Sequence, residues 1–410
     1  MKSMACSKMW TAINIQPDSQ QILTCAHRRG PVVSLAELQQ LGAKVFTSVP
    51  TNVQDREVFI DQQALPRACE TCSRNWPHAL WHIHNKWQDR EWTAAQLQQL
   101  KTADMVQKIE IALSNVCNQT CMYCRPKRSS EWAKLLGQAP SADPQWTAAV
   151  KAALQDYIAT SLSQRSTPIS YNILGGEPLL NTELYDFMHT ILDAHSLDLH
   201  ANRQRQFTIT TNLNVKPQLV QRLLQVMDTR PGWEWQLKCS IDAVGHVGET
   251  IRDGLSVEQF AENLALVMAN PRVFVEILPT VTALSLPASA ELIAWCKHMA
   301  NQQGLLQLYG TRWQIGINMV SRPVALHVGN LTSDYRSCVD HCVHEVSELP
   351  SCVSKTQLLQ HLENLRALIG TRCSPEDRQV MRQWFVQQGQ LKQRDYWQDF
   401  AVLTDLLGPR

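Results

Sequence analysis

Six short runs rich in apolar and β-branched residues alternate with stretches of helical periodicity from residue 108 onward. The runs are KIEIALS (108–114), ISYNILG (169–175), FTITTN (207–212), WQLKCSID (235–242), VFVEILPTV (273–281) and WQIGINMV (313–320). Apolar residues recur at helical spacing in the stretches 181–195, 216–227, 256–270 and 288–303. The alternation predicts parallel strands joined by crossover helices. Six such units predict an α/β fold, a partial (β/α)6 TIM-like barrel with its chemistry at the carboxyl ends of the strands.

The rest of the chain lacks this rhythm, which predicts three domains. Residues 1–107 form a cysteine-rich region, residues 108–329 the partial barrel, and residues 330–410 a helical C-terminal extension rich in Gln and Leu. A chain of 410 residues is long enough for one large α/β domain with smaller additions.

Charge and hydropathy exclude several classes of protein. Lys and Arg number 38 against 37 Asp and Glu, so no whole-chain field would attract nucleic acid or an anionic membrane. No apolar run approaches the length of a membrane span, and the start of the chain lacks the apolar core of a secretory signal. We therefore expect a cytoplasmic protein with neither a membrane nor a nucleic acid as partner.

Thirteen cysteines are many for a cytoplasmic protein, and in a reducing compartment they favour metal or redox chemistry over disulfides. Three of them, Cys117, Cys121 and Cys124, follow the first predicted strand at C-x3-C-x2-C spacing. Three thiolates on one loop can bind three irons of a [4Fe–4S] cube and leave the fourth iron open for a cofactor. A partial zinc site is the alternative, although a structural zinc needs four ligands and no fourth lies nearby in sequence.

Four further cysteines precede the predicted barrel: Cys6, Cys25, Cys69 and Cys72. Four thiolates are enough to close a second iron–sulfur cluster, and they are equally a tetrahedral zinc set. The sequence alone does not distinguish the two metals.

The cysteine loop, with Tyr123 before its last cysteine, resembles that of the radical S-adenosylmethionine (SAM) superfamily. Further motifs follow in the family's order. They are Gly175-Gly176-Glu177-Pro178 after the second strand, Thr210-Thr211-Asn212 at the end of the third, and Ser240-Ile241-Asp242-Ala243 at the end of the fourth with Arg252 downstream. In the third motif the family's usual glycine is replaced by Leu213.

This resemblance implies a role for each motif. The Gly-Gly-Glu-Pro segment would hold the SAM amino group, because glycines allow close backbone approach and a carboxylate pairs with an ammonium. Asn212 would lie near the SAM ribose. Ser240 and Arg252 would approach the SAM carboxylate, which suits the planar guanidinium of arginine. Tyr123 and Asp242 lie in the same motifs, and the resemblance makes them cofactor-binding candidates as well. Taken without the family, the first motif is a turn and Arg252 a solvated loop charge.

The N-terminal region resembles the N-terminal twitch arrangement of one radical SAM subfamily, in which a half-size auxiliary-cluster module precedes the barrel. The resemblance implies an auxiliary [4Fe–4S] cluster on Cys6, Cys25, Cys69 and Cys72. Many relatives have two adjacent cysteines where this chain has Cys25 followed by Ala26. Zinc on the same four thiolates stays the rival interpretation.

The family resemblance also implies a reaction. SAM would cap the open iron and be cleaved reductively to a 5′-deoxyadenosyl radical, which abstracts a hydrogen atom from the substrate. Cys117, Cys121 and Cys124 are thus the predicted catalytic residues, with a flavodoxin- or ferredoxin-type reductant as partner. The expected substrate is a ribosomal peptide. The alternatives are an epimerase or dehydrogenase acting on a sugar or other small metabolite, and a non-catalytic zinc-binding interaction protein.

Other cysteines and histidines receive simpler interpretations. His78, His82 and His84 are expected at the surface, and Cys239 and Cys296 as buried thiols, since both lie in apolar patterns. A further metal site could form near the C-terminus. Its candidate ligands are Cys338, His341, Cys342 and His344, joined by Cys352 or Cys373.

Overall fold

A computed structural model describes residues 8–24, 32–48, 50–62, 93–100, 104–138, 143–200, 202–320 and 322–409. The chain forms two compact units. The first comprises residues 1–115 and 140–207, and the second comprises residues 116–139 and 208–410. The three-domain division predicted from the sequence stays a prediction.

The first unit contains four neighbouring strands in the order β2-β1-β3-β4. Their bounds are β1 Ala12–Gln16, β2 Gln21–Leu23, β3 Lys108–Ala112 and β4 Ile169–Leu174. β3 runs parallel to both β1 and β4, whereas β1 and β2 form an antiparallel pair. The sequence predicted β3 and β4 but missed β1 and β2, because AINIQ and QIL are short apolar runs without a following helical repeat.

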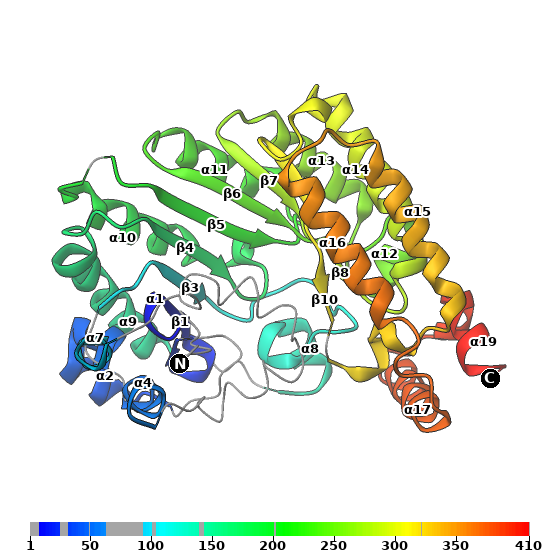
Figure 1. The fold of residues 1–410 in the computed structure, drawn as a ribbon, viewed down its shortest axis with the longest axis horizontal. Helices are drawn as coiled ribbons and strands as arrows, with labels where there is room; N and C mark the ends of the chain where they lie inside the picture. The colour runs from blue at the N-terminus through cyan, green and yellow to red at the C-terminus, as the bar shows by residue number, and fades with distance from the viewer. Residues whose placement is uncertain are drawn as a thin grey trace. The chain divides into compact units, whose positions relative to one another are not determined.

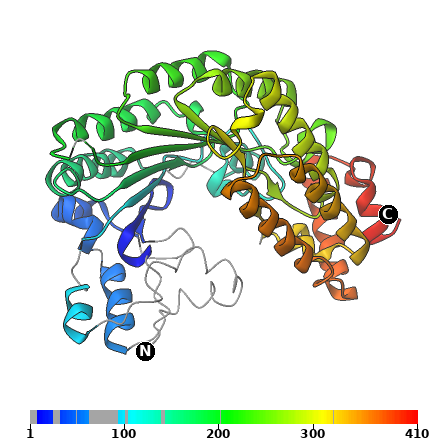
Figure 2. The same ribbon diagram turned by 45° about the horizontal axis from the view of Figure 1, so that its top comes forward.

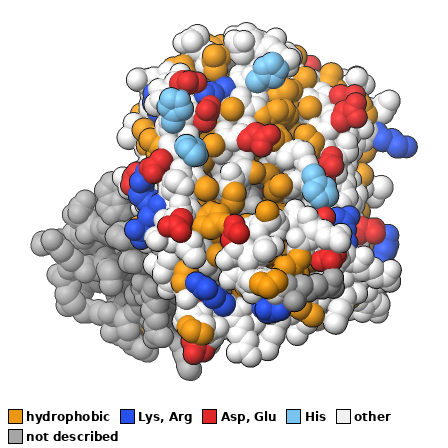
Figure 3. Space-filling model, turned by 90° about the vertical axis from the view of Figure 1, so that its right-hand side faces the viewer, with side chains coloured by type: hydrophobic (Ala, Val, Ile, Leu, Met, Phe, Trp, Pro, Cys, Tyr) orange, Lys and Arg blue, Asp and Glu red, His pale blue; other side chains and the backbone are white. Residues whose placement is uncertain are grey.

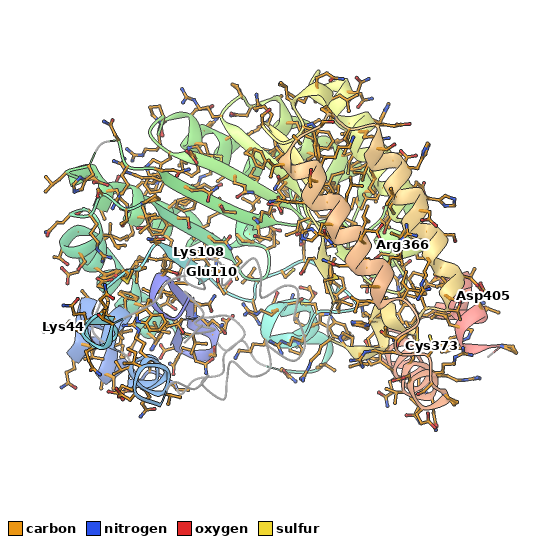
Figure 4. All side chains as sticks on the ribbon, viewed as in Figure 1. Lys44, Lys108, Glu110, Arg366, Cys373 and Asp405 are labelled. Carbon is orange, nitrogen blue, oxygen red and sulfur yellow. The ribbon has the colours of Figure 1, made fainter. Side chains whose placement is uncertain are left out.

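The first unit also contains seven α-helices among its described residues. They are α1 Lys8–Thr11, α2 Leu35–Leu41, α3 Val45–Ser48, α4 Pro50–Gln62, α7 Ala94–Leu100, α9 Pro144–Tyr157 and α10 Leu184–Ala194. α9 packs against α2 and α10, and the indole of Trp146 on α9 donates to the carbonyl of Val33 at 2.7 Å. On β3, the ammonium of Lys108 forms an ion pair with the carboxylate of Glu110, with the nitrogen and oxygen 2.8 Å apart. Both residues are labelled in Figure 4.

The second unit carries the order β5-β6-β7-β9. β5 Arg205–Thr211 begins in the first unit and is followed by β6 Glu234–Cys239, β7 Val273–Ile277 and β9 Trp313–Ile315. β6, β7 and β9 pair in parallel, as do the short strands β8 Thr280–Val281 and β10 Asn318–Met319. All six predicted strand runs therefore contain strands.

Side chains of β6 alternate between two environments. Trp235, Leu237 and Cys239 are buried, as predicted for that thiol. Gln236 and Lys238 point the other way and donate to Glu276 of β7 at 2.8 and 2.9 Å. This period of two is what pleated strands impose.

The second unit is otherwise helical. Its helices are α8 Ser130–Leu135, α11 Pro217–Asp228, α12 Gly245–Ile251, α13 Val257–Ala269, α14 Ser289–Gln302, α15 Arg336–Ser347, α16 Val353–Leu368, α17 Pro375–Lys392, α18 Tyr396–Asp399 and α19 Ala401–Leu407. α11 packs against α13, and α13 against β7 (Figure 1). The four predicted helical stretches correspond to α10, α11, α13 and α14, and the helical C-terminal extension is also confirmed.

The C-terminal helices pack on one another. α15 contacts both α14 and α16, and the three helices lie side by side (Figure 2). Arg366 of α16, which is labelled in Figure 4, pairs with Asp340 of α15. Lys297 of α14 pairs with Glu345 of α15 at 2.6 Å. Figure 3 shows acidic, basic and histidine side chains interspersed with hydrophobic ones on this face.

The α/β class with a mostly parallel sheet is thus confirmed. Closure of the strands into a partial barrel stays a prediction. In the described ranges, no helix combines the length and apolar character that a membrane span requires.

A buried charge cluster stabilises the first unit. The carboxylate of Asp198 pairs with Arg203 at 2.5 Å and with Arg205 at 3.2 Å. The side chains of Asp198 and Arg203 are each 1% exposed. His195 bridges the cluster to the hydroxyl of Tyr171, at 2.7 Å. Removing one partner of such a pair leaves an unpaired buried charge.

We expect Asp198→Asn to lower the free energy of unfolding by about 3 kcal/mol or more, because Arg203 would keep a buried charge without its counterion. Asp186→Asn is the matched control, since Asp186 is 71% exposed and lies 3.6 Å from Lys151, and it should cost less than about 0.5 kcal/mol. Urea unfolding measures both. If the two variants lost equal free energy of unfolding, Asp198 would not have the stabilising role given to it here.

The pKa of His195 is lowered to about 4, first by burial and then by the positive charge of Arg203. The folded state therefore binds fewer protons than the unfolded state between pH 6.5 and about 4, so stability falls as the pH falls through that window. We expect a loss of about 2 kcal/mol from about pH 7 to about pH 5 that is absent in His195→Gln. Urea unfolding of the wild type and of His195→Gln at both pH values measures this loss. If the free energy of unfolding changed with pH equally in the two proteins, the role given to His195 would be refuted.

Candidate functional site

The cysteine loop, residues 116–125, belongs to the second unit and follows β3 in sequence. Its middle is held by two backbone hydrogen bonds. The amide of Thr120 donates to the carbonyl of Asp253, and the amide of Met122 donates to the carbonyl of Ile251, both at 2.8 Å. Cys121 lies between these two anchors and is buried, so the backbone fixes the position of this thiol.

The segment that follows the loop supports it from a second direction. The hydroxyl of Ser129 donates to the carbonyl of Gln119 at 2.6 Å and also caps α8. The indole of Trp132, on α8, donates to the carbonyl of Cys121 at 2.9 Å. The amide of Cys117 donates to the hydroxyl of Ser130 at 3.1 Å. These supports were not predicted from the sequence, although a serine before a short helical run is a capping signal.

Next to the loop, Asp242 is the centre of a buried polar cluster. Its carboxylate accepts from the hydroxyl of Tyr123 at 2.7 Å, from the guanidinium of Arg252 at 2.9 Å and from the amide of Thr280 at 2.7 Å. The side chain of Asp242 is 0% exposed and that of Arg252 is 7% exposed. The structure thus brings together three residues that the sequence predicted as cofactor-binding.

The protonation of this cluster follows from its burial. Burial alone would lower the pKa of Arg252, but the carboxylate of Asp242 outweighs it and the pKa is raised. Burial also raises the pKa of Tyr123, so its phenol stays protonated and donates. The predicted contact of Arg252 with the SAM carboxylate stays a prediction. Here its guanidinium is paired with Asp242.

Asn212 and Ser240 lie at the ends of their strands, as predicted. The amide group of Asn212 donates to the side chain of Asn118, in the cysteine loop, at 2.9 Å. The backbone amide of Ser240 donates to the carbonyl of Thr211 at 2.8 Å. Leu213 has a φ of 50°, a left-handed conformation that favours glycine.

The Gly-Gly-Glu-Pro motif belongs to the first unit. Gly175 has a φ of 141°, and a Cβ there would lie 2.5 Å from the carbonyl oxygen of Ser114. The amide of Gly176 donates to that same oxygen at 2.8 Å. Glu177 is buried, and its carboxylate accepts from the amide of Leu179 at 3.0 Å, which caps the turn that begins at Pro178. Glycine is therefore required at position 175 by its backbone conformation and by the close approach of the two chain segments.

The three thiols of the loop differ in exposure: Cys121 is buried, whereas Cys117 and Cys124 are partly exposed. Burial raises the pKa of Cys121; the guanidinium of Arg252 opposes this rise, and the thiols of Cys124 and Cys117 add to it. Burial likewise raises the pKa of Cys124, while the guanidiniums of Arg128 and Arg252 oppose it. A metal that binds here must displace the thiol protons. The surrounding arginines favour a negatively charged group.

The donor set fits an iron–sulfur cube. Among the residues that the structure describes, no group of three or more His, Cys, Asp or Glu side chains could hold a metal ion. A cube does not require such a group, because each thiolate binds a different iron. The same finding covers the C-terminal candidates Cys338, His341, Cys342, His344, Cys352 and Cys373. The four N-terminal cysteines, with His78, His82 and His84, lie outside the described residues.

Comparison with known proteins gives little further information. No family model matches the chain, and no curated protein matches it. Two similar solved structures are histidine-tagged anSMEcpe with bound AdoMet, with a TM-score of 0.40, and native anSMEcpe with bound AdoMet and Cp18Cys peptide, with a TM-score of 0.36. Both are 14% identical to this chain. The first match covers 59% of each chain, and the second covers 57% of this chain and 56% of the other. Likenesses this weak carry no argument about function.

We expect Asp242→Asn to destabilise the second unit by about 3 kcal/mol or more even without any cofactor, because Arg252 would remain buried without a counterion. Tyr123→Phe removes one hydrogen bond to a charged group and should cost about 1.5 to 3 kcal/mol. Chemical unfolding of the metal-free chain measures both. Asp228→Asn is the control, since its side chain is 53% exposed and 3.9 Å from Arg272. A loss in the control as large as in Asp242→Asn would contradict the role given to the buried pair.

Proposed function

We propose that this protein is a radical SAM enzyme whose [4Fe–4S] cluster is bound by Cys117, Cys121 and Cys124. The observation that carries the proposal is the loop itself. Three thiols at C-x3-C-x2-C spacing follow a parallel strand, one of them is buried between two backbone anchors, and a polar cluster of Tyr123 and Asp242 lies beside them. Three thiolates leave one iron of a cube without a protein ligand.

When bound, the cluster would supply the electron that cleaves SAM and so begins radical chemistry on the substrate. The chain contributes position and shielding. Backbone bonds from Thr120 and Met122 hold the loop in place, and burial of Cys121 keeps water from its sulfur. Hydrogen bonds from Tyr123 and Arg252 hold the side chain of Asp242 in place, which orders the end of the fourth predicted strand where Ser240 lies.

For the remaining residues we propose the roles that the family resemblance implies. Gly175, Gly176, Glu177 and Pro178 would bind the SAM amino group, Asn212 would lie near the ribose, and Ser240 and Arg252 would act at the carboxylate. Cys6, Cys25, Cys69 and Cys72 would hold an auxiliary [4Fe–4S] cluster. A flavodoxin- or ferredoxin-type protein would supply electrons, and a ribosomal peptide is the proposed substrate, with a small metabolite as the alternative.

Anaerobic reconstitution tests the proposal. Wild-type protein should bind about eight irons, two cubes, and form 5′-deoxyadenosine from SAM and dithionite. Replacing Cys117, Cys121 and Cys124 with Ala should leave about one cluster and abolish 5′-deoxyadenosine. Iron and sulfide counts together with chromatography of the products measure both outcomes.

The matched control replaces Cys338, Cys352 and Cys373 with Ala, three partly buried thiols elsewhere in the second unit. It should keep all the iron and the cleavage activity. Loss of all iron on replacing the loop cysteines would disprove the second cluster. Colourless, zinc-loaded wild-type protein with no affinity for SAM would support the non-catalytic alternative and refute the enzyme.

A further inference from the structure

A buried lysine from the C-terminal extension contacts the cysteine loop. Lys392 is the last residue of α17, and its side chain is 3% exposed. Its ammonium donates to the backbone carbonyl of Thr120 and, at 3.1 Å, to the hydroxyl of the same residue. The two residues are 272 positions apart in the chain. The C-terminal extension therefore reaches the residue directly before Cys121.

The same ammonium has two other partners. The carboxylate of Asp253 lies 3.4 Å away, and this carboxylate also accepts from the hydroxyl of Thr120 at 2.7 Å and from Arg394 at 2.9 Å. The ring of Trp132 lies 4.7 Å from the ammonium, within the range of a cation–π interaction. Three elements distant in sequence thus meet around one buried charge.

Each of these partners is connected to Cys121. Thr120 is its neighbour in the chain and is bonded through its amide to Asp253. Trp132 donates to the carbonyl of Cys121. Loss of Lys392 would leave the Thr120 carbonyl and the Trp132 ring without their common partner. The carbonyl belongs to the peptide bond before Cys121, and the Trp132 side chain is bonded to the carbonyl of Cys121 itself. An apolar residue could fill this space but could not donate a hydrogen bond.

We propose that Lys392 is a positioning residue, which clamps the cysteine loop from the C-terminal extension and places a positive charge beside the Cys121 sulfur. The second part rests on the proposed function, because it concerns the cluster bound there. A positive charge close to a cluster stabilises the reduced form, which carries one more negative charge. Burial strengthens this effect, since little water lies between the charges.

The clamp can be tested on the reduced, metal-free chain. Buried thiols react with an alkylating agent when the structure around them opens locally. In Lys392→Met we expect N-ethylmaleimide to modify Cys121 about tenfold faster than in the wild type, since the loss of charged hydrogen bonds makes opening easier. Peptide mass spectrometry follows each thiol separately. The buried Cys239 reports global unfolding and should react at the wild-type rate.

Lys355→Met is the matched control for this experiment. Lys355 also lies in the C-terminal extension and donates to two backbone carbonyls, those of Ser347 at 2.7 Å and Leu349 at 2.6 Å. It should leave Cys121 as protected as in the wild type. If Lys392→Met does not fold, Lys392→Gln keeps a donor of similar length without the charge and takes its place.

The charge is tested on reconstituted protein. Redox titration followed by electron paramagnetic resonance should give a more negative midpoint potential for the Cys117/Cys121/Cys124 cluster in Lys392→Gln than in the wild type. Lys392→Arg keeps the charge, so its cluster should have the midpoint potential of the wild type. A purely structural lysine would leave the potential unchanged.

Faster Cys121 alkylation with unchanged Cys239, together with the shifted potential, supports the proposal. Unchanged alkylation of Cys121 in the Lys392 variants overturns the clamp, and an unchanged potential overturns the electrostatic role. If the wild type itself binds no iron at the loop, the proposed function is wrong, and the alkylation rates alone decide whether Lys392 clamps the loop.

Discussion

The pairing of the cysteine loop with residues 251–253 is the constraint on which the site depends. Two backbone hydrogen bonds, from Thr120 and Met122, align the loop with this segment and fix Cys121 between them. The segment is itself held at both of its charged residues. Arg252 turns toward Asp242, and Asp253 turns toward the loop, so one short stretch of backbone joins two ionic clusters.

The two clusters connect the loop to the rest of the second unit. Asp242 follows β6 and accepts from the amide of Thr280 at the start of β8, so the polar cluster is tied to the strand ends. Asp253 connects the loop to α17 through Lys392 and to the nearby Arg394. These contacts make the C-terminal extension a part of the site.

Much of the fold was predictable because its signals are local. Strand runs, and helical repeats such as those of α11 and α13, can be recognised from residues that are close together in the sequence. The cysteine spacing and the position of Asn212 and Ser240 at strand ends were predictable for the same reason. The pairing of Arg252 with Asp242 and the contact of Lys392 with Thr120 were not, because they depend on tertiary packing between segments that carry no matching pattern. β1, which pairs with β3, was missed because it is a buried strand of only five residues, too few for an alternation of polar and apolar residues to be recognised.

The most direct test of the account is the electron paramagnetic resonance spectrum of dithionite-reduced, reconstituted wild-type protein, recorded before and after SAM is added. An open iron at the Cys117, Cys121 and Cys124 cluster predicts a [4Fe–4S]⁺ signal whose g values change when SAM binds. A spectrum without a cubane signal, or a cubane signal that SAM leaves unchanged, would contradict the account.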